Sequence, residues 1–336
     1  MKKHLKSQME DFRSSRMFGG AATSNEKALP TLLPGSFSFF SSRLVSFNSS
    51  AFMTSLIPLP VRRFLGGWLH TFQGRAKKIA LLKSLRGSGT KCNVCGWEGR
   101  AFADDQWHPG TICPLCGSQV RHRMLAAAFD GMSKVGGLDE NAQLAGKAIL
   151  HFAPERQLRN RISRAAGKYL TADYDRGDCD LRLDISSMPS VTDQSFDVVI
   201  SCDVLEHVPN DLAAMREIHR ILRPGGTAIL TVPQMDPPNH TDEDASILSE
   251  SQREIRFGQK DHVRMYGDDF SGRLEDAGFS VTAIEQSSFA PTTVESHILC
   301  PPVSNRSRLA TNQRRIYFAK KSAAAVITDR PGSPSD

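Results

Sequence analysis

The sequence predicts an α/β fold: a doubly wound, mostly parallel sheet of seven strands, with a small four-cysteine module ahead of it. Between residues 148 and 233, short apolar runs alternate with a segment of helical spacing, which is the order of a βαβ series. An acidic residue, Asp173, ends the second apolar run. Two C-x-x-C pairs precede the series, and such pairs indicate a metal site.

Length and charge limit the classes of protein that fit. The chain has 336 residues, of which 40% are hydrophobic, so it can bury one large core or two modest ones. The formal net charge is +6, but residues 1–90 hold 14 Lys and Arg against 3 Asp and Glu. The remainder is therefore mildly acidic, which argues against a broad nucleic-acid surface on the folded body.

The two ends of the chain have the composition of extensions. Residues 1–88 are basic, and within them residues 29–66 are rich in Ser, Phe, Leu and Pro. We expect most of residues 1–88, and residues 322–336, to be disordered. A cleaved signal peptide is a less favoured alternative for the first segment. Residues 61–85 mix basic with apolar side chains, so they could form an amphipathic helix on an anionic surface or pack on the body. No run of 18 apolar residues predicts a membrane span, and we expect a cytoplasmic protein.

Residues 89–124 are predicted to form a zinc ribbon. Cys92 and Cys95 form one C-x-x-C pair, Cys113 and Cys116 a second, and 17 residues separate the pairs. Two such knuckles complete a tetrahedron of thiolates, which is typical of structural Zn²⁺. A glycine follows each pair, where a knuckle favours positive φ. A redox dithiol is the alternative, but no thioredoxin-like context surrounds either pair.

Three basic residues follow the second knuckle, namely Arg121, His122 and Arg123. They could contact substrate or phosphate, or they could form a solvated helix start drawn to the thiolates. The sequence favours neither interpretation.

Residues 125–321 supply the predicted sheet domain. Strands are expected at 148–155, 168–173, 180–185, 195–203 and 227–233, and a helix at 210–222 that Pro224-Gly225-Gly226 ends. A second helix is expected at 269–277, followed by strands at 279–285 and 314–321. The polar segment 235–268 is an insertion after the fifth strand, where a substrate lid commonly lies.

The acid-ended second strand, the run FDVVISCDVLEHV and the LRPGG turn resemble the class I S-adenosylmethionine (SAM)-dependent methyltransferases, and most closely their quinone-pathway branch. The resemblance covers about residues 146–285 and the last strand. It implies that Asp173 accepts the ribose hydroxyls of SAM. It also implies cofactor contacts from six further residues: His151, Ala153, Glu155, Asp184, Ile185 and Cys202.

One departure from that family concerns the first turn. The family turn is rich in glycine, whereas His151 to Gln157 contains none. Glycines let a backbone approach a ligand closely, so the methionyl end of SAM must be held differently or not at all. We expect Glu155 to face the ammonium group of the cofactor. Helix capping by Glu155, or a lost cofactor site, are the alternatives.

Candidate catalytic residues follow the fourth strand. Asp203, Glu206 and His207 are spaced i, i+3, i+4, which places them on one face of a helical turn. The resemblance implies a Mg²⁺ ion near these three residues, and His207 could instead be a general base. The alternative is that these three residues only cap a helix and line the floor of the cofactor site. In the insertion, His262 is a second candidate base, with Asp261, Arg264 and Tyr266 beside it.

The expected function is therefore SAM-dependent methyl transfer to a small-molecule, saccharide or lipid-linked acceptor. An RNA methyltransferase with the zinc ribbon as reader is an alternative, although the acidic body and 7% aromatic residues disfavour it. A non-catalytic binding module on the same fold is a third possibility.

Overall fold

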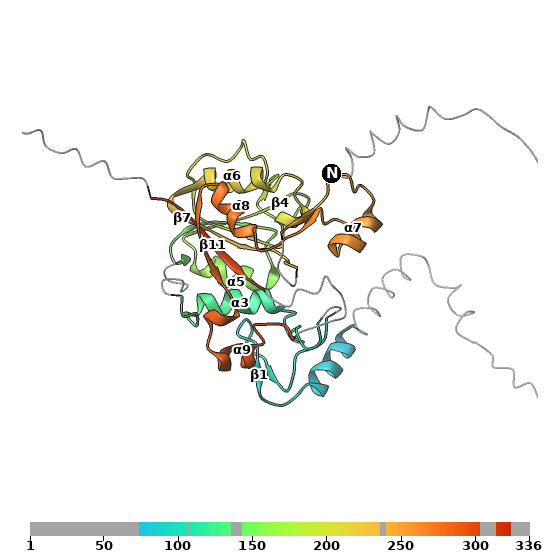
Figure 1. Cartoon of the computed structure of the whole chain (residues 1–336). Coiled ribbons are helices and arrows are strands. Elements are labelled where there is room, and N and C mark those ends of the chain that lie inside the picture. The colour runs from blue at the N-terminus through green and yellow to red at the C-terminus, as the bar shows by residue number, and fades with distance from the viewer. Residues whose placement is uncertain (1–73, 106–107, 136–142, 236–239, 303–313, 324–336) are drawn as a thin grey trace, which may run out of the picture. The chain divides into compact units, whose positions relative to one another are not determined.

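A seven-stranded sheet organises the described part of the chain (Figure 1). The computed structural model describes residues 74–105, 108–135, 143–235, 240–302 and 314–323. The expected disorder of residues 1–73 and 324–336 lies outside these ranges. Among the described helices, none is both long enough and apolar enough to cross a membrane.

The strand order is β10-β11-β7-β6-β3-β4-β5. The strands are β3 (Ala148–Phe152), β4 (Lys168–Asp173), β5 (Leu181–Arg182), β6 (Phe196–Cys202), β7 (Leu222–Thr231), β10 (Phe279–Ile284) and β11 (Ile316–Lys321). β5, β4, β3, β6 and β7 pair in parallel, and β11 runs antiparallel to both β7 and β10. The predicted fold class, a mostly parallel sheet of seven strands, is confirmed.

Helices cover both faces of the sheet, and successive side chains along a strand belong alternately to two hydrophobic cores. On β6, Val199 belongs to the core under α6 (Asp211–Ile221) and α8 (Phe270–Asp276), whereas its neighbours Val198 and Ile200 belong to the core under α3 (Val120–Phe129) and α5 (Arg156–Ala165). Figure 1 shows the two helix layers on opposite sides of the strands. The alternation follows from the period of two along a strand.

The strand order reverses beside β3. From β3 the chain adds β4 and β5 on one side, and then places β6 and β7 on the other. In doubly wound sheets, ligands bind in the crevice at the carboxyl ends of the two strands at such a reversal. The turns after Phe152 and Cys202 are therefore the expected location of a ligand site.

Two elements differ from their predicted bounds. β7 begins at Leu222, immediately after α6, so the LRPGG segment belongs to the strand rather than to a connecting turn. Its register against β6 shifts between Phe196 and Val198, which indicates a bulge, and Gly225 has φ of 78°. The third predicted strand is reduced to the two residues of β5.

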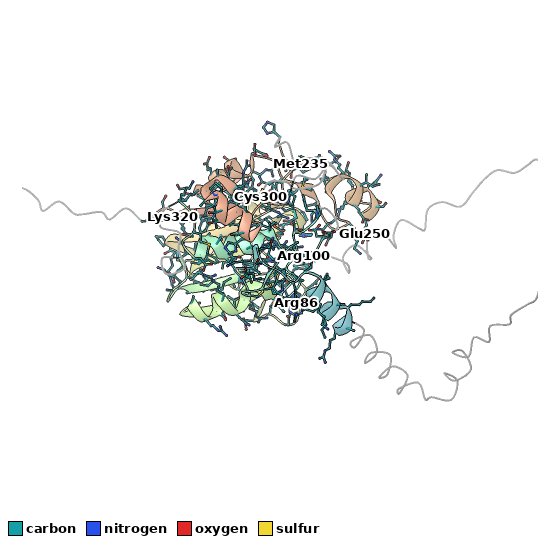
Figure 2. The ribbon with its side chains drawn as sticks, turned by 90° about the horizontal axis from the view of Figure 1, so that it is seen from below. Arg86, Arg100, Met235, Glu250, Cys300 and Lys320 are labelled. Atoms are coloured by element: carbon teal, nitrogen blue, oxygen red, sulfur yellow. The ribbon has the colours of Figure 1, made fainter. Side chains whose placement is uncertain are left out.

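The cysteine module precedes the sheet and shares a helix with it. It holds β1 (Thr90–Lys91) and β2 (Glu98–Gly99), and a helix at 74–84 leads into it. The backbone N–H of Arg100 donates to Leu85 O (3.0 Å), and Figure 2 labels Arg86 and Arg100 in this region. The predicted boundary after residue 124 falls inside α3, so one helix belongs to both parts.

The insertion after β7 contains β8 (Asp242–Glu243), α7 (Glu250–Phe257) and β9 (Arg264–Met265). β8 and β9 pair antiparallel. The remaining elements are η1 (Leu205–His207), η2 (Gln286–Ser288) and α9 (Pro291–His297).

Candidate functional site

Two residues at the strand reversal hold an unusual backbone conformation. Ala153 follows β3 with φ of 44°, and Asp203 follows β6 with φ of 52°. The left-handed region is unfavourable for residues with a Cβ, and such strain concentrates at functional sites. Each turn is held by a backbone hydrogen bond, from Ala153 N to Ala172 O (2.8 Å) and from Asp203 N to Thr231 O (2.9 Å).

The carboxylate of Glu155 lies buried among three basic side chains. Arg121 Nε donates to Glu155 Oε1 (3.2 Å), and His122 Nε2 lies 3.2 Å from the same oxygen. His151 Nε2 lies 3.6 Å from Oε2. Oε2 has no hydrogen-bond partner among the described residues. Glu155 is the N-cap residue of α5, yet its side chain makes no capping hydrogen bond.

The protonation of this cluster follows from its contacts. Burial disfavours the charged form of Glu155, but His122, His151 and Arg121 outweigh burial and hold the pKa of Glu155 well below its usual range. Burial lowers the pKa of His122. The Nδ1 atom of His122 accepts the backbone N–H of Gln119 (2.9 Å), so the neutral ring carries its proton on Nε2, toward Glu155.

Asp203 sits between two arginines. Its Oδ2 lies 3.3 Å from Arg121, Arg314 donates to Oδ1 (3.1 Å), and the hydroxyl of Thr231 also donates to Oδ1 (2.9 Å). Burial opposes ionisation, but the two arginines keep the pKa of Asp203 below its usual value. Arg121 therefore spans the reversal, because it contacts both Glu155 after β3 and Asp203 after β6.

The other predicted cofactor contacts lie at neighbouring strand ends. Asp173 is the last residue of β4, and its Oδ1 accepts the backbone N–H groups of Asp175 and Arg176 (both 3.0 Å). Asp184 is exposed and accepts from the backbone N–H of Ser186 (2.8 Å). Two further residues, Ile185 and Cys202, are buried.

Glu206, His207 and His262 come together beside this reversal. Glu206 Oε1 lies 3.9 Å from His207 Nε2 and 4.0 Å from His262 Nε2. The two imidazole rings meet edge to face at 4.7 Å. Burial and the charge of Asp203 raise the pKa of Glu206 well above its usual value, while burial and His207 lower the pKa of His262. The sequence grouped Glu206 and His207 with Asp203, whereas the structure adds His262 from the insertion.

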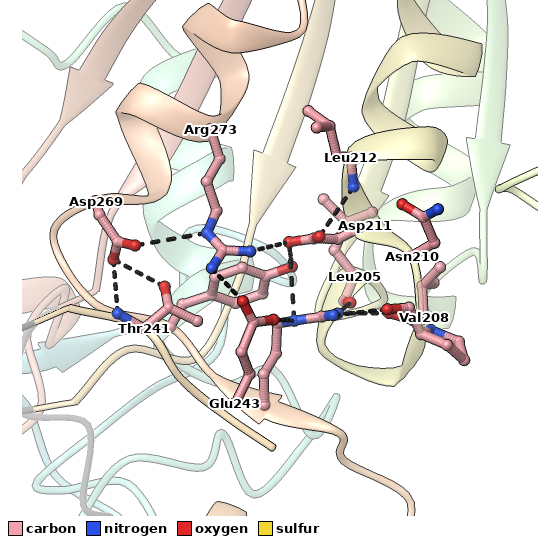
Figure 3. A network of polar contacts seen from close by, with 12 residues as sticks. Leu205, Val208, Asn210, Asp211, Leu212, Thr241, Glu243, Asp269 and Arg273 are labelled. Atoms are coloured by element: carbon pink, nitrogen blue, oxygen red, sulfur yellow. Dashed lines mark hydrogen bonds and ion pairs between the residues drawn. The ribbon is translucent and has the colours of Figure 1, made fainter. Parts of the chain in front are cut away.

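A salt-bridged network fastens the insertion to the turn that carries Glu206 (Figure 3). The buried guanidinium of Arg264 donates to the carbonyls of Leu205 (3.0 Å) and Val208, and its Nε donates to Glu243 (2.9 Å). Arg273 links Glu243 (2.6 Å) with Asp211 (2.9 Å). Buried contacts of Arg264 therefore hold the insertion against η1.

A cavity of about 710 Å³ opens at this point. Its walls come from the cysteine module, from the ends of β6 and β7, and from the insertion. The residues that carry its charge are Asp104, Asp105, His108, Arg121, Asp203, Glu206, His207, His262 and Arg314. The cavity lies on the Asp203 side of the reversal, and Asp173 is not among its lining residues.

The four predicted metal ligands converge. Cys92 Sγ lies 3.7 Å from Cys116 Sγ, and Cys95 Sγ lies 3.7 Å from Cys113 Sγ. Sulfurs about 2.3 Å from a tetrahedral zinc ion lie about 3.8 Å apart, so the spacing fits Zn²⁺. The glycines after the pairs, Gly96 and Gly117, have φ of 75° and 73°, as the knuckles require.

A buried arginine supports a negative charge at these thiolates. Arg123 is fully buried, and its guanidinium donates hydrogen bonds to the carbonyls of Ser118, His297 and Ile298. No carboxylate pairs with it among the described residues. Four thiolates around Zn²⁺ carry two negative charges, which supply a counter-ion for this guanidinium.

Part of the chain is similar to a known protein family. Residues 116–230 match the family described as "Methyltransferase domain". About a third of the chain is therefore similar to that family. The match begins at Cys116, so the first knuckle and the insertion lie outside it.

Curated relatives match the same part of the chain. The ubiquinone biosynthesis O-methyltransferase of Pseudomonas aeruginosa (strain UCBPP-PA14) is 26% identical over 121 aligned positions, which cover 31% of this chain and 52% of the relative. The chain thus spans about half the length of the curated relatives it matches.

Solved methyltransferase structures also resemble the chain, each at 17% identity. A putative methyltransferase from Bacillus halodurans C-125 covers 55% of this chain and 95% of its own, with a TM-score of 0.35. A SAM-dependent methyltransferase from Mesorhizobium loti covers 53% and 93%, with a TM-score of 0.37.

Two arginines at the strand reversal are not predicted as site residues by the sequence. For Arg121 the sequence indicates only a substrate or phosphate contact or a solvated helix start, and it gives no indication of Arg314. Arg314 lies 111 positions from Asp203. Arg314 directly precedes the last strand, and that strand lies beside the parallel strands in the sheet. This position is the signal that could have indicated Arg314 as a site residue.

Proposed function

We propose that the protein transfers a methyl group from SAM to a small-molecule acceptor. The observation that carries this proposal is a carboxylate, Asp173, at the end of β4, together with a separate cavity that Asp203 lines across the strand reversal. A cavity of this size lies within the range of small-molecule sites, about 300–1,000 Å³. A saccharide, free or lipid-linked, is the finer acceptor class that we propose.

The side chains at the ends of β3, β4 and β5 are suited to the two ends of SAM. Asp173 ends β4 with a carboxylate that can accept the ribose hydroxyls, and Asp184 with Ile185 lies at the end of the neighbouring strand. At the other end, the unpartnered Oε2 of Glu155 is an acceptor suited to the ammonium group. Arg121, which also contacts Glu155, is suited to bind the carboxylate of the methionyl end of SAM. These contacts would replace the missing glycine turn.

The reaction needs alignment and the removal of one proton. Bound SAM would supply an electrophilic methyl carbon on a sulfonium, and the acceptor must approach in line with the carbon–sulfur bond. The family resemblance implies that Cys202 and Asp203 lie near the sulfonium, and Asp203 also lines the cavity. His207, which is half-buried, and His262 lie in the cavity wall, where they can receive the acceptor proton. We propose that Asp203 orients the acceptor.

We propose a structural role for Zn²⁺ in the cysteine module. All four ligands are thiolates, so no coordination position remains open for substrate. The proposed location is the cytoplasm, where such thiolates stay reduced.

Calorimetric titration of the full chain with S-adenosylhomocysteine tests the proposed function. We expect one binding site per chain, and a variant that fills the crevice, Ala153→Trp, should bind at least tenfold more weakly. A wild-type protein that binds neither SAM nor its demethylated product would contradict the proposal and favour a non-catalytic module. Nucleic acid that copurifies and is released by salt would favour the RNA alternative.

A further inference from the structure

Three side chains in the cavity wall have the composition of a metal site. Glu206, His207 and His262 offer a carboxylate oxygen and two imidazole nitrogens, and these atoms all lie within 4.8 Å of one another. Glu206 is 1% exposed and His262 is 3% exposed. The atoms Glu206 Oε2 and His262 Nε2 have no hydrogen-bond partner among the described residues. Buried polar atoms are normally satisfied, so these two point to a missing ligand.

The outer nitrogens of both imidazoles are already engaged. His262 Nδ1 lies 2.9 Å from the carbonyl of Phe257, and His207 Nδ1 lies 3.3 Å from the carbonyl of Asp261 and 3.5 Å from its carboxylate. A carbonyl can only accept, so each Nδ1 carries the proton and each Nε2 presents a lone pair. Histidines that bind metals usually donate their second nitrogen to a carbonyl or carboxylate in this way.

The backbone around the three residues is fixed before any ion binds. Val263 N donates to the carbonyl of Glu206 (2.9 Å), and Arg264 holds the carbonyls on either side of the η1 turn. Ligands held by buried contacts lose little freedom on binding. Three ligand atoms about 2.1 Å from a tetrahedral ion lie about 3.4 Å apart, and Glu206 Oε1 already lies 3.9 Å and 4.0 Å from the two imidazole nitrogens.

We propose that Glu206, His207 and His262 bind one divalent transition-metal ion at the base of the acceptor cavity. Two nitrogens and one carboxylate suit Mn²⁺, Fe²⁺, Co²⁺ or Zn²⁺, whereas Mg²⁺ prefers oxygen ligands. Asp203 is not a ligand, because two arginines and Thr231 already surround its carboxylate. The ligand set therefore differs from the Mg²⁺ site that the sequence suggested at Asp203, Glu206 and His207.

Such an ion would leave coordination positions open toward the cavity, since the protein supplies three ligands. Resting on the proposed methyltransferase function, we assign these positions to an oxygen of the acceptor. A hydroxyl bound there would lose its proton more readily because of the charge of the ion. His207 and His262 then act as ligands rather than as bases.

Titration of the zinc-loaded full chain with Mn²⁺ alone, in metal-free buffer, tests the site by calorimetry. Thiolates retain Zn²⁺ in preference to Mn²⁺, so the cysteine module does not interfere. We expect about one Mn²⁺ per chain, at least tenfold weaker binding for Glu206→Gln and for His262→Gln, and at least tenfold weaker binding of Mg²⁺ to the wild type. Asp203→Asn should retain binding within threefold, as should the remote control His219→Gln.

Absence of Mn²⁺ binding to the wild type would overturn the inference, as would a loss in Asp203→Asn equal to that in Glu206→Gln. Co²⁺ gives a second readout that does not depend on folding of the variants. One equivalent of Co²⁺ added to the zinc-loaded wild type should add absorption without a thiolate charge-transfer band, and a thiolate band would contradict the ligand set. SAM binding is measured on the same samples, so wild type that binds SAM but no Mn²⁺ defeats this inference alone.

Discussion

At the scale of single residues, the site depends on side chains that hold strained turns. A non-glycine residue in the left-handed region costs about 1–3 kcal/mol when it sits at a functional site. Ala153 and Asp203 both adopt this conformation at the strand reversal. The contacts of Arg121 with Glu155 and Asp203 tie the two turns together, and charged hydrogen bonds of this kind stabilise by about 1.5–3 kcal/mol each.

Asp173 is predictable from sequence because strand β4 ends in an acid, and its role can be tested directly. Asp173→Ala should weaken SAM binding at least tenfold in calorimetry, since two ribose hydroxyls lose a charged acceptor. Asp173→Asn keeps an acceptor for the backbone N–H groups of Asp175 and Arg176 and should also bind SAM weakly. Asp175→Ala, in an exposed position of the same turn, is the control. Unchanged affinity in Asp173→Asn would remove Asp173 from the cofactor site.

A substitution of Glu155 should affect binding of the amino-acid end of the cofactor and not of its nucleoside end. Glu155→Gln should weaken SAM binding about tenfold, because it removes the charge that faces the ammonium group and holds Arg121. Methylthioadenosine lacks the amino-acid end, so its affinity should change little. The exposed variant Glu275→Gln serves as the control. Equal losses for both ligands would show that Glu155 supports only the turn, although its side chain makes no capping bond.

At the scale of elements, the apolar runs predicted most of the sheet. Runs such as Phe196–Cys202 and Lys168–Asp173 are short, apolar and bounded by turn residues, so local sequence decides them. The start of β7 was wrong, because Pro224 and the two glycines after it predicted a turn. Pairing of Leu222 with Phe196 extends the strand through that segment, and such tertiary pairing is not visible in local propensity.

The start of helix α3 predicts a dependence of stability on pH. Burial lowers the pKa of His122, so the unfolded chain binds more protons than the folded chain below the ordinary value of about 6.5. Stability therefore falls as the pH drops from 7 to 5, by at most about 1.4 kcal/mol per pH unit for this residue. Glu155, whose pKa is lowered, adds a further loss only below about pH 4.5.

The variant His122→Asn should have a smaller loss of unfolding free energy between pH 7 and pH 5 than the wild type. Denaturant unfolding at several pH values measures this difference. His262 and His219 also have lowered pKa values, so part of the slope will remain. An unchanged slope in His122→Asn would show that His122 titrates alike in both states.

At the scale of the whole described structure, the site is assembled from distant segments. Arg121 follows the second knuckle, Asp203 follows β6, His262 comes from the insertion and Arg314 precedes the last strand. Sequence spacing predicted the thiolate set and the pair Glu206 and His207, because those residues are neighbours along the chain. It could not predict that Arg314 or His262 joins them, since those contacts exist only once the sheet and the insertion have packed.

This assembly makes the cysteine module part of the candidate site. The second knuckle leads directly into α3, and Gln157 of α5 donates to the carbonyl of Gly117 (3.3 Å). Zinc binding and folding are coupled in such modules. Loss of zinc should therefore loosen α3, and with it Arg121 and the turn at Ala153, before it affects the helices on the opposite face of the sheet.

The variant Cys113→Ser tests this coupling in the full chain. Elemental analysis should show about one zinc ion fewer per chain than in the wild type, with Cys179→Ser as a matched control that keeps its metal. Hydrogen exchange should rise severalfold in α3 and in residues 153–155, because their hydrogen bonds open more often once the knuckle is free. Exchange in α6 and α8, which cover the opposite face of the sheet, should stay slow. If all strands lose protection together, the metal stabilises the whole fold rather than the site. If α3 stays protected without zinc, the module and the site are independent, and the contacts of Arg121 with Glu155 and Asp203 suffice to hold the reversal.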